Sequence, residues 1–266
     1  MKEHSENSIT LSYIRIGSGR KVALAFHGFG QDSSHFNCFE PVLGKEYTLY
    51  SFDLPWHGRE NIKKTEKPAD RNALKAFFLD FFESNDITKF LNIGYSIGAK
   101  ISLILLDLFP DKTERLLLIA PDGFRTNFWF RLATGSRLTR SLFKYITYKP
   151  RFFFMFSDMM VRMKLVHPGV SRFAQSQMNT VSKREKVYFT WIFFRKLRSH
   201  KNRILKILVD FNIPISVFLG SDDKVIRPGQ FKFLTEALPV SCKVTILDTG
   251  HNNLIGETAR YLEKSQ

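Results

Sequence analysis

Short runs rich in apolar residues alternate along this chain with segments that have helical spacing. Strand-like runs of five to seven residues, rich in apolar side chains, recur along the chain at 22–26, 47–52, 90–95, 116–120, 213–219 and 243–247. Between them, residues 70–83 and 97–109 carry apolar side chains at the intervals of a helix. Short strands that alternate with helices favour a mostly parallel sheet covered by helices on both faces, so we expect an α/β fold.

One further run begins the series. Residues 9–16 alternate like a strand, and Gly17-Ser18-Gly19 separates them from the run at 22–26. A short turn with glycine between two such runs is typical of a β-hairpin. We therefore expect these two strands to pair with each other.

The net charge of +15 belongs to one segment of the 266-residue chain. Of the 40 Lys and Arg and the 25 Asp and Glu, residues 122–206 hold 19 and three, together with 12 of the 27 Phe. This segment contains amphipathic, helix-compatible stretches at 128–142, 150–165 and 183–206. We predict that residues 1–121 and 207–266 form the α/β core and that residues 122–206 form a mostly helical, basic insertion.

The sequence Gly94-Tyr95-Ser96-Ile97-Gly98 lies between a predicted buried strand and a predicted helix. A sharp strand-to-helix turn of this pattern lifts the serine hydroxyl above the sheet edge, and its cramped backbone requires both glycines. The helix N-terminus behind it directs N–H groups toward an anion. Ser96 is therefore a candidate nucleophile, the alternative being a tight turn with an incidental serine.

Three other strand ends carry groups that a serine nucleophile needs. His27-Gly28-Phe29-Gly30 follows the run at 22–26, where small residues let the N–H of Phe29 approach a reacting carbonyl together with the N–H of Ile97. Gly220-Ser221-Asp222-Asp223 and Gly250-His251 follow the last two strands. A base and a carboxylate that orients it are the partners such a serine requires, and the carboxyl ends of parallel strands meet at one sheet edge.

Together these residues, with Phe52-Asp53-Leu54-Pro55-Trp56-His57-Gly58, resemble the α/β-hydrolase family over essentially the whole chain. The resemblance implies a mostly parallel eight-stranded sheet with a helical cap inserted after the sixth strand, where the basic segment begins. It also implies Ser96 as nucleophile, His251 as base and Asp223 as acid, with oxyanion N–H groups from Phe29 and Ile97. Asp53 and His57 match positions that usually shape a loop.

Two other carboxylates remain open as the acid. Asp222 adjoins Asp223, and Asp122 stands after the run at 116–120, where some relatives place this residue. Relatives with an aspartate nucleophile are disfavoured, because a serine occupies that position.

The resemblance implies a serine hydrolase that cleaves an ester or thioester of a hydrophobic acyl substrate through an acyl-enzyme. A C–C bond hydrolase or lyase and an acyltransferase share the triad and stay as alternatives. A membrane- or nucleic-acid-binding protein with a vestigial hydrolase core is the alternative from another class. The basic, Phe-rich cap suits an anionic membrane surface or an anionic substrate, whereas nucleic acid is disfavoured because no recognised binding motif appears.

The remaining residues point to a cytoplasmic protein without metal or cofactor. Cys38 and Cys242 are too few for a disulfide framework and have no metal-ligand spacing. The polar N-terminus lacks the apolar core of a signal peptide, and no run reaches the roughly 18 apolar residues of a membrane span. We expect a cytoplasmic location, at most peripheral to the inner face of a membrane. The other histidines are read as surface or loop residues, namely His4, His35, His167 and His200.

Overall fold

The computed structural model describes residues 9–57, 65–124 and 128–265, which fall into two compact units. The first contains residues 9–57, 69–124 and 197–265, and the second contains residues 65–68 and 128–196. The sequence-based division at 122 and 206 differs from this at both ends. Residues 197–206 belong with the first unit. They contain the start of a helix, and Ile204 of that helix packs into the hydrophobic core beside the sheet.

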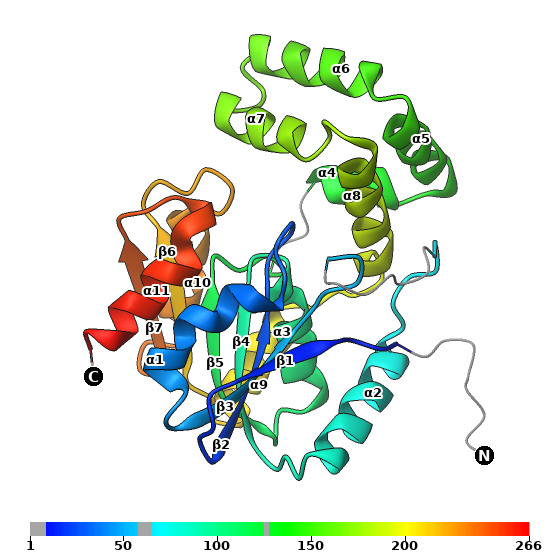
Figure 1. The fold of residues 1–266 in the computed structure, drawn as a ribbon. Helices are drawn as coiled ribbons and strands as arrows, with labels where there is room; N and C mark the ends of the chain where they lie inside the picture. Colours follow the sequence, from blue (N-terminus) through cyan, green and yellow to red (C-terminus); the bar gives the residue numbers. More distant parts are fainter. Residues whose placement is uncertain (1–8, 58–64, 125–127, 266) are drawn as a thin grey trace, which may run out of the picture. The chain divides into compact units, whose positions relative to one another are not determined.

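The first unit is built on a seven-stranded sheet in the order β1-β3-β2-β4-β5-β6-β7 (Figure 1). The strands are β1 (Tyr13–Ile16), β2 (Lys21–Phe26), β3 (Tyr47–Phe52), β4 (Phe90–Tyr95), β5 (Thr113–Ile119), β6 (Ile215–Gly220) and β7 (Cys242–Leu247). Every neighbouring pair is parallel except β1 and β3, so the predicted mostly parallel sheet is confirmed. The described residues provide seven strands rather than the expected eight, which matches the seven apolar runs of the sequence.

The predicted hairpin between β1 and β2 is wrong, because β3 lies between these two strands. β1 pairs with β3 in antiparallel fashion, and β2 pairs with β3 in parallel. The glycines of the connection serve a close approach to the chain before β3: a Cβ on Gly19 would lie 2.0 Å from the carbonyl carbon of Glu46. Gly17 has φ +75°, a conformation that glycine adopts without strain.

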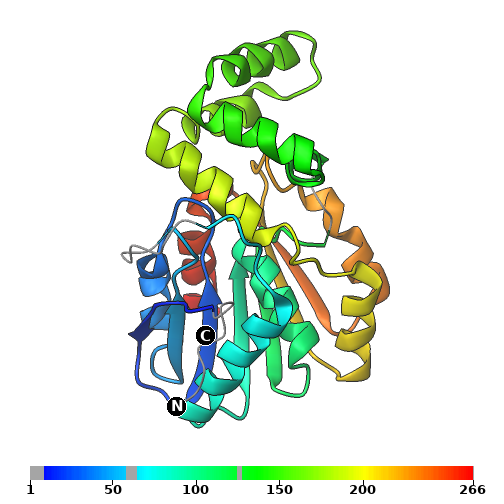
Figure 2. The same ribbon diagram turned by 90° about the vertical axis from the view of Figure 1, so that its right-hand side faces the viewer.

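Helices cover both faces of this sheet (Figures 1 and 2). They are α1 (Glu40–Leu43), α2 (Arg71–Ser84), α3 (Gly98–Leu108), α9 (Lys201–Asp210), α10 (Lys232–Ala237) and α11 (Leu254–Glu263). Alternate strand residues divide between the faces, so that Ala23, Ile93 and Ile119 pack beneath α11 while Leu116, Leu118 and Val217 pack beneath α3 and α9. This layered core brings the carboxyl ends of the parallel strands to one edge.

The described residues of the second unit form helices and no strand. These helices are α4 (Phe128–Thr134), α5 (Arg137–Tyr148), α6 (Arg151–Arg162), α7 (Pro168–Ser176) and α8 (Val181–Phe194). The helix expected over 128–142 is interrupted, because Ser136 caps α5 by accepting from the N–H of Thr139. Glu66 joins this unit through its carboxylate, 2.6 Å from Lys144 Nζ, and its carbonyl, which accepts from Arg195.

Two buried contacts organise the helices of the second unit. The guanidinium of Arg184 on α8 donates to the carbonyl oxygens of Thr147 and Met178, at 2.6 and 2.9 Å. The rings of Phe143 on α5 and Tyr188 on α8 lie 5.2 Å apart.

In the part of the chain that the structure describes, no helix has both the length and the apolar composition that a bilayer span requires.

Candidate active site

Ser96 lies on a sharp turn between β4 and α3. Its φ is +49°, a left-handed conformation that costs a residue with a Cβ about 1–3 kcal/mol and is typical of functional positions. The two flanking glycines make this turn possible. A Cβ on Gly94 would lie 2.5 Å from Ser102 Oγ, and one on Gly98 would lie 2.2 Å from the carbonyl oxygen of Phe26. The backbone therefore holds the Ser96 hydroxyl at the end of β4.

His251 lies between Ser96 and Asp223. Its Nε2 is 3.0 Å from Ser96 Oγ, and its Nδ1 is 2.6 Å from Asp223 Oδ2. A carboxylate only accepts, so Nδ1 carries the proton and Nε2 presents its lone pair to the serine hydroxyl. The three residues come from the ends of β4, β6 and β7, at one edge of the sheet.

Asp223 is held rigidly on its other oxygen. Asp223 Oδ1 accepts from the backbone N–H groups of Val225 and Ile226, at 2.7 and 2.8 Å, and its side chain is fully buried. Asp222 is exposed, with its carboxylate 3.9 Å from Lys224 Nζ. The carboxylate that the structure brings to His251 is therefore that of Asp223.

The third carboxylate considered from the sequence has another partner. Asp122 Oδ2 lies 3.0 Å from the ammonium of Lys100, a buried residue of α3. Its backbone N–H donates to the carbonyl of Ser96 at 3.0 Å. Through these two contacts, Asp122 fixes the chain that follows β5 to α3 and to the backbone carbonyl of Ser96.

Tyr95 is a site residue that the sequence analysis missed. Its hydroxyl donates to the carbonyl oxygen of His251 at 2.7 Å, and the centroids of the two rings are 5.3 Å apart. Burial raises the pKa of Tyr95, so the hydroxyl keeps its proton and remains a donor. The residue stands in the serine motif itself, but nothing in the sequence links it to a histidine 156 positions away.

The loop after β2 lies against the turn of Ser96. A Cβ on Gly28 would lie 2.5 Å from Tyr95 Cε1, and the carbonyls of Phe26 and His27 leave no room for one on Gly98. The backbone of residues 26–28 is thus close to the start of α3. This arrangement keeps the N–H groups of Phe29 and Ile97 as candidate oxyanion donors, which stays a prediction.

His27 holds this loop and is neutral. It is fully buried, and burial lowers its pKa to about 4. Its Nδ1–H donates to the carbonyl of Gly28 at 2.8 Å, and its Nε2 accepts from the N–H of Leu54 at 3.0 Å. Because both ring nitrogens are engaged in a neutral ring, the 3.9 Å approach of Nε2 to Asp53 is no ion pair. His27 therefore ties the loop after β2 to the loop after β3.

Asp53 and His57 also support loops. Asp53 Oδ1 accepts from the N–H of Ser33 at 2.7 Å, and His57 Nδ1 lies 2.9 Å from the carbonyl oxygen of Pro55. The ring of Phe29 packs edge-on against His57 with centroids 5.0 Å apart. Both residues thus fix loops that surround the site.

The remaining predicted residues lie outside the site. His35 forms a capping box with Asp32, and His167 Nδ1 accepts from the N–H of Gly169, while His4 falls outside the described residues. Across the parts of the chain that the structure describes, no three His, Cys, Asp or Glu side chains are grouped to hold a metal ion. Burial raises the pKa of Cys242 to about 11, which keeps that thiol protonated at neutral pH.

Residues 24–258 match the family model of the alpha/beta hydrolase fold. Lipase 3 of Moraxella sp. (strain TA144) is 24% identical, over 94% of this chain and 81% of that protein. The dihydrolipoyllysine-residue acetyltransferase component of the acetoin cleaving system of Pseudomonas putida is 33% identical over 40% of this chain, which covers 28% of that protein. A solved thermophilic esterase from Thermogutta terrifontis superposes with a TM-score of 0.67 at 16% identity, over 96% of this chain and 91% of that one. The chain therefore belongs to the α/β-hydrolase fold family and is an enzyme of the hydrolase class.

Proposed function

We propose that this hydrolase cleaves carboxylic esters or thioesters of hydrophobic acyl groups, with Ser96 as nucleophile, His251 as general base and Asp223 as the orienting carboxylate. The observation that carries the proposal is the continuous chain of contacts from Asp223 Oδ2 through both nitrogens of His251 to Ser96 Oγ, at 2.6 and 3.0 Å. The similarity to a protein named as a lipase supports an ester as the substrate.

The reaction proceeds in two acyl transfers. His251 Nε2 takes the proton of Ser96 as Oγ attacks the carbonyl carbon, and a tetrahedral oxyanion forms. The imidazolium is stabilised by Asp223 and returns the proton to the leaving alcohol or thiol as the acyl–oxygen or acyl–sulfur bond breaks. Water then attacks the acyl-enzyme with His251 again as the base, releasing the carboxylic acid and restoring Ser96.

The oxyanion is assigned to the backbone N–H groups of Phe29 and Ile97. Ile97 stands at the start of α3, where the N–H groups of the first turn have no helical partner and the helix dipole favours negative charge. The loop of Phe29 follows His27, whose two hydrogen bonds fix the backbone directly before it. One donor from each segment would hold the oxyanion beside Ser96.

The test uses p-nitrophenyl esters of graded chain length with the wild type and Ser96→Ala. We expect Ser96→Ala to lower kcat by about 10⁴-fold or more, because the proposed acyl-enzyme forms on the Ser96 hydroxyl. Each additional methylene that the acyl site buries is worth about 0.8 kcal/mol, so kcat/KM should rise about fourfold per carbon up to the limit of the site. An unchanged rate in Ser96→Ala would overturn the proposal, and transfer to an added alcohol in preference to water would instead indicate an acyltransferase.

A further inference from the structure

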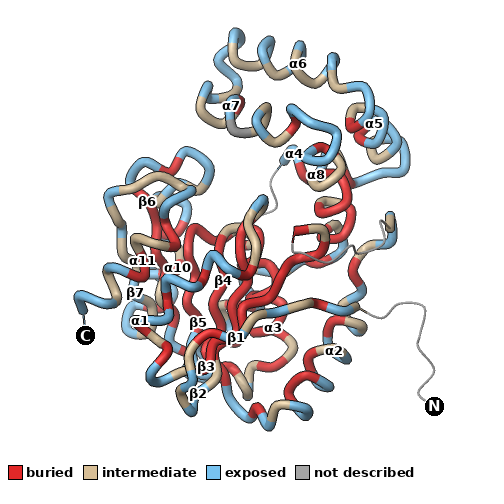
Figure 3. Tube along the Cα trace, in the orientation of Figure 1, coloured by how far each residue is buried: buried red, intermediate tan, exposed pale blue. Residues whose placement is uncertain are grey.

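Helix α6 exposes apolar side chains where a surface helix normally exposes polar ones. It has no buried residue (Figure 3). Its exposed apolar side chains recur at intervals of three and four residues and so share one face: Phe152 (56% exposed), Met155 (65%), Phe156 (43%) and Met159 (45%), continued by Met163 (58%). In a globular protein such a face is ordinarily turned toward the core.

Two polar side chains of α6, Ser157 and Asp158, contact the neighbouring helix α7. Ser157 Oγ is 2.8 Å from Ser171 Oγ of α7, and the amide of Gln175 on α7 donates to Asp158 at 2.8 Å. These two side chains meet α7, and the apolar row points elsewhere. Helix α6 is therefore apolar on two faces: Phe153, Phe154, Met160 and Val161 are half-buried, whereas the row that contains Phe152 is exposed.

The apolar row continues onto two other helices of the same unit. The rings of Tyr145 on α5 and Phe152 lie 6.4 Å apart, and those of Trp129 on α4 and Phe156 lie 6.1 Å apart. Helix α5 adds exposed residues one helical turn apart, Leu138 (79%) and Leu142 (57%). We call this surface the apolar face; it consists of Trp129, Leu138, Leu142, Tyr145, Phe152, Met155, Phe156, Met159 and Met163.

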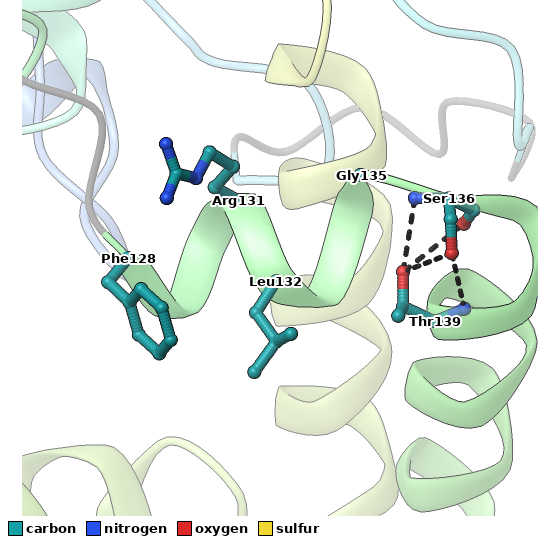
Figure 4. A pocket seen from close by; sticks show the side chains of 6 residues that line it. All are labelled: Phe128, Arg131, Leu132, Gly135, Ser136 and Thr139. Atoms are coloured by element: carbon teal, nitrogen blue, oxygen red, sulfur yellow. Dashed lines mark hydrogen bonds between the residues drawn. The ribbon is translucent and has the colours of Figure 1, made fainter.

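A shallow pocket lies beside the apolar face on α4 and the start of α5 (Figure 4). Phe128 and Leu132, four residues apart, project from the same side of α4. Arg131 on the same helix adds a guanidinium to the lining, and Ser136 and Thr139 add hydroxyl groups. The pocket thus combines apolar side chains with one cation.

Cations border the apolar face, and carboxylates are scarce around it. Residues 128–196 contain 14 Lys and Arg against two Asp and Glu. Arg151 and Arg162 lie along one side of the apolar row of α6. On α5, Arg137 lies along the corresponding side of the exposed row that begins with Leu138. The two acidic residues are already engaged, Asp158 by Gln175 and Glu185 by the hydroxyl of Tyr148.

We propose that the apolar face docks this protein onto an anionic phospholipid bilayer. Apolar side chains that enter the interface, edged by cations that meet lipid phosphates, are the chemistry of interfacial helices. A second copy of the chain fits less well, since it would place two strongly positive surfaces together. A nucleic acid would use the cations but leave the Leu and Met rows in water. The inference concerns binding only and does not depend on Ser96.

The test is co-sedimentation of the full chain with vesicles of phosphatidylcholine alone or with about 30 mol% phosphatidylglycerol. Each cation near an anionic leaflet is worth about fivefold in binding, so Arg151→Gln/Arg162→Gln should bind the anionic vesicles about 25-fold more weakly. Phe152→Ser/Met155→Ser should reduce binding to both kinds of vesicle. Raising the salt from about 0.1 M to 1 M should lower binding of the wild type to the anionic vesicles toward its binding to phosphatidylcholine alone, because the screening length falls from about 10 Å to 3 Å.

Matched controls lie on the first unit. Phe211→Ser/Val240→Ser changes side chains 49% and 98% exposed, and Lys232→Gln/Lys264→Gln removes two exposed cations. Both should bind like the wild type, and all variants should keep its circular dichroism and Tm. Ser96→Ala should also bind like the wild type, which separates docking from turnover.

Three results would overturn the proposal. One is equal binding, or none, to neutral and anionic vesicles. Another is equal loss of binding in the control variants, which would mean that total charge rather than this surface is responsible. The third is a concentration-dependent dimer in sedimentation velocity that Phe152→Ser/Met155→Ser abolishes while vesicle binding is absent, which would assign the apolar face to a second copy of the chain.

Discussion

Replacing Asp223 with Asn changes one atom type and tests how the carboxylate orients His251. Asp223 uses both oxygens: Oδ1 accepts from the N–H groups of Val225 and Ile226, and Oδ2 accepts from Nδ1–H of His251. An asparagine has only one oxygen. If that oxygen keeps the two backbone bonds, the amide NH₂ faces His251, whose Nδ1 must then accept. Nε2 would carry the proton and could not take one from Ser96.

The size of the effect follows from the alternative orientation of the amide. Turning the oxygen toward His251 restores the active tautomer but points NH₂ at two buried N–H donors. Each unmade hydrogen bond costs about 1–3 kcal/mol, so this orientation is disfavoured by about 2–6 kcal/mol. At about 1.4 kcal/mol per tenfold, the active arrangement is populated roughly 30-fold to 10⁴-fold less, and kcat should fall by that factor.

The assay compares kcat and KM for a p-nitrophenyl ester in Asp223→Asn and in Asp222→Asn. Asp222 is the adjacent, exposed carboxylate and serves as the matched control, which should retain activity within about twofold because exposed charges contribute little. KM should change less than kcat in Asp223→Asn, since the substrate does not contact this residue. The reasoning would be refuted if Asp223→Asn kept more than a tenth of the wild-type kcat. It would also be refuted if Asp222→Asn lost more activity than Asp223→Asn.

Three further predictions concern the support of the site. Tyr95→Phe removes the hydroxyl that donates to the carbonyl of His251 at 2.7 Å, so the free energy of unfolding measured in urea should fall by about 1–2 kcal/mol. Labelling by a fluorophosphonate should persist in this variant, and loss of labelling would contradict the prediction. Because the pKa of His27 is about 4 in the folded protein and about 6.5 in the unfolded chain, the unfolded state takes up the proton first as pH falls, so this residue should remove about 2 kcal/mol of stability between pH 7 and 5. His27→Gln should show a correspondingly shallower pH dependence in urea unfolding, and an equal slope would count against a neutral His27. Gly98→Ala should lower the free energy of unfolding by more than about 3 kcal/mol, because the new Cβ would meet backbone oxygens at 2.2 and 2.4 Å. Gly256→Ala on α11 has open space around its Cβ and should raise the free energy of unfolding by about 0.5–1 kcal/mol, which a thermal scan would register as a higher Tm.

The centre of the sheet could be predicted from the sequence because its inner strands are buried on both faces and are therefore rich in apolar residues. Residues 90–95, for example, form a strand that is buried throughout. The partner of β1 could not be predicted in this way. Its apolar pattern suits either neighbour, and the decision rests on the approach of Gly17 and Gly19 to the chain before β3, which no local pattern reveals.

Some residues of the candidate site could be predicted from the sequence, and others could not. Ser96, Asp223 and His251 were predictable because each follows a strand end, and parallel strands bring those ends together. The choice between Asp222 and Asp223 needed the structure, since only the turn that directs Asp223 Oδ1 to two backbone N–H groups points its other oxygen at His251. Tyr95 was not predictable, because its partner is a backbone carbonyl far away in the sequence.

Peptide mass spectrometry after reaction with a fluorophosphonate tests directly whether Ser96 is the nucleophile. We predict a single adduct on the peptide that contains Ser96, formed in the wild type and lost in Ser96→Ala. Labelling should also be slowed in His251→Ala, because Nε2 of His251 lies 3.0 Å from Ser96 Oγ and takes its proton. An adduct on another residue, or one that persists in Ser96→Ala, would contradict the account.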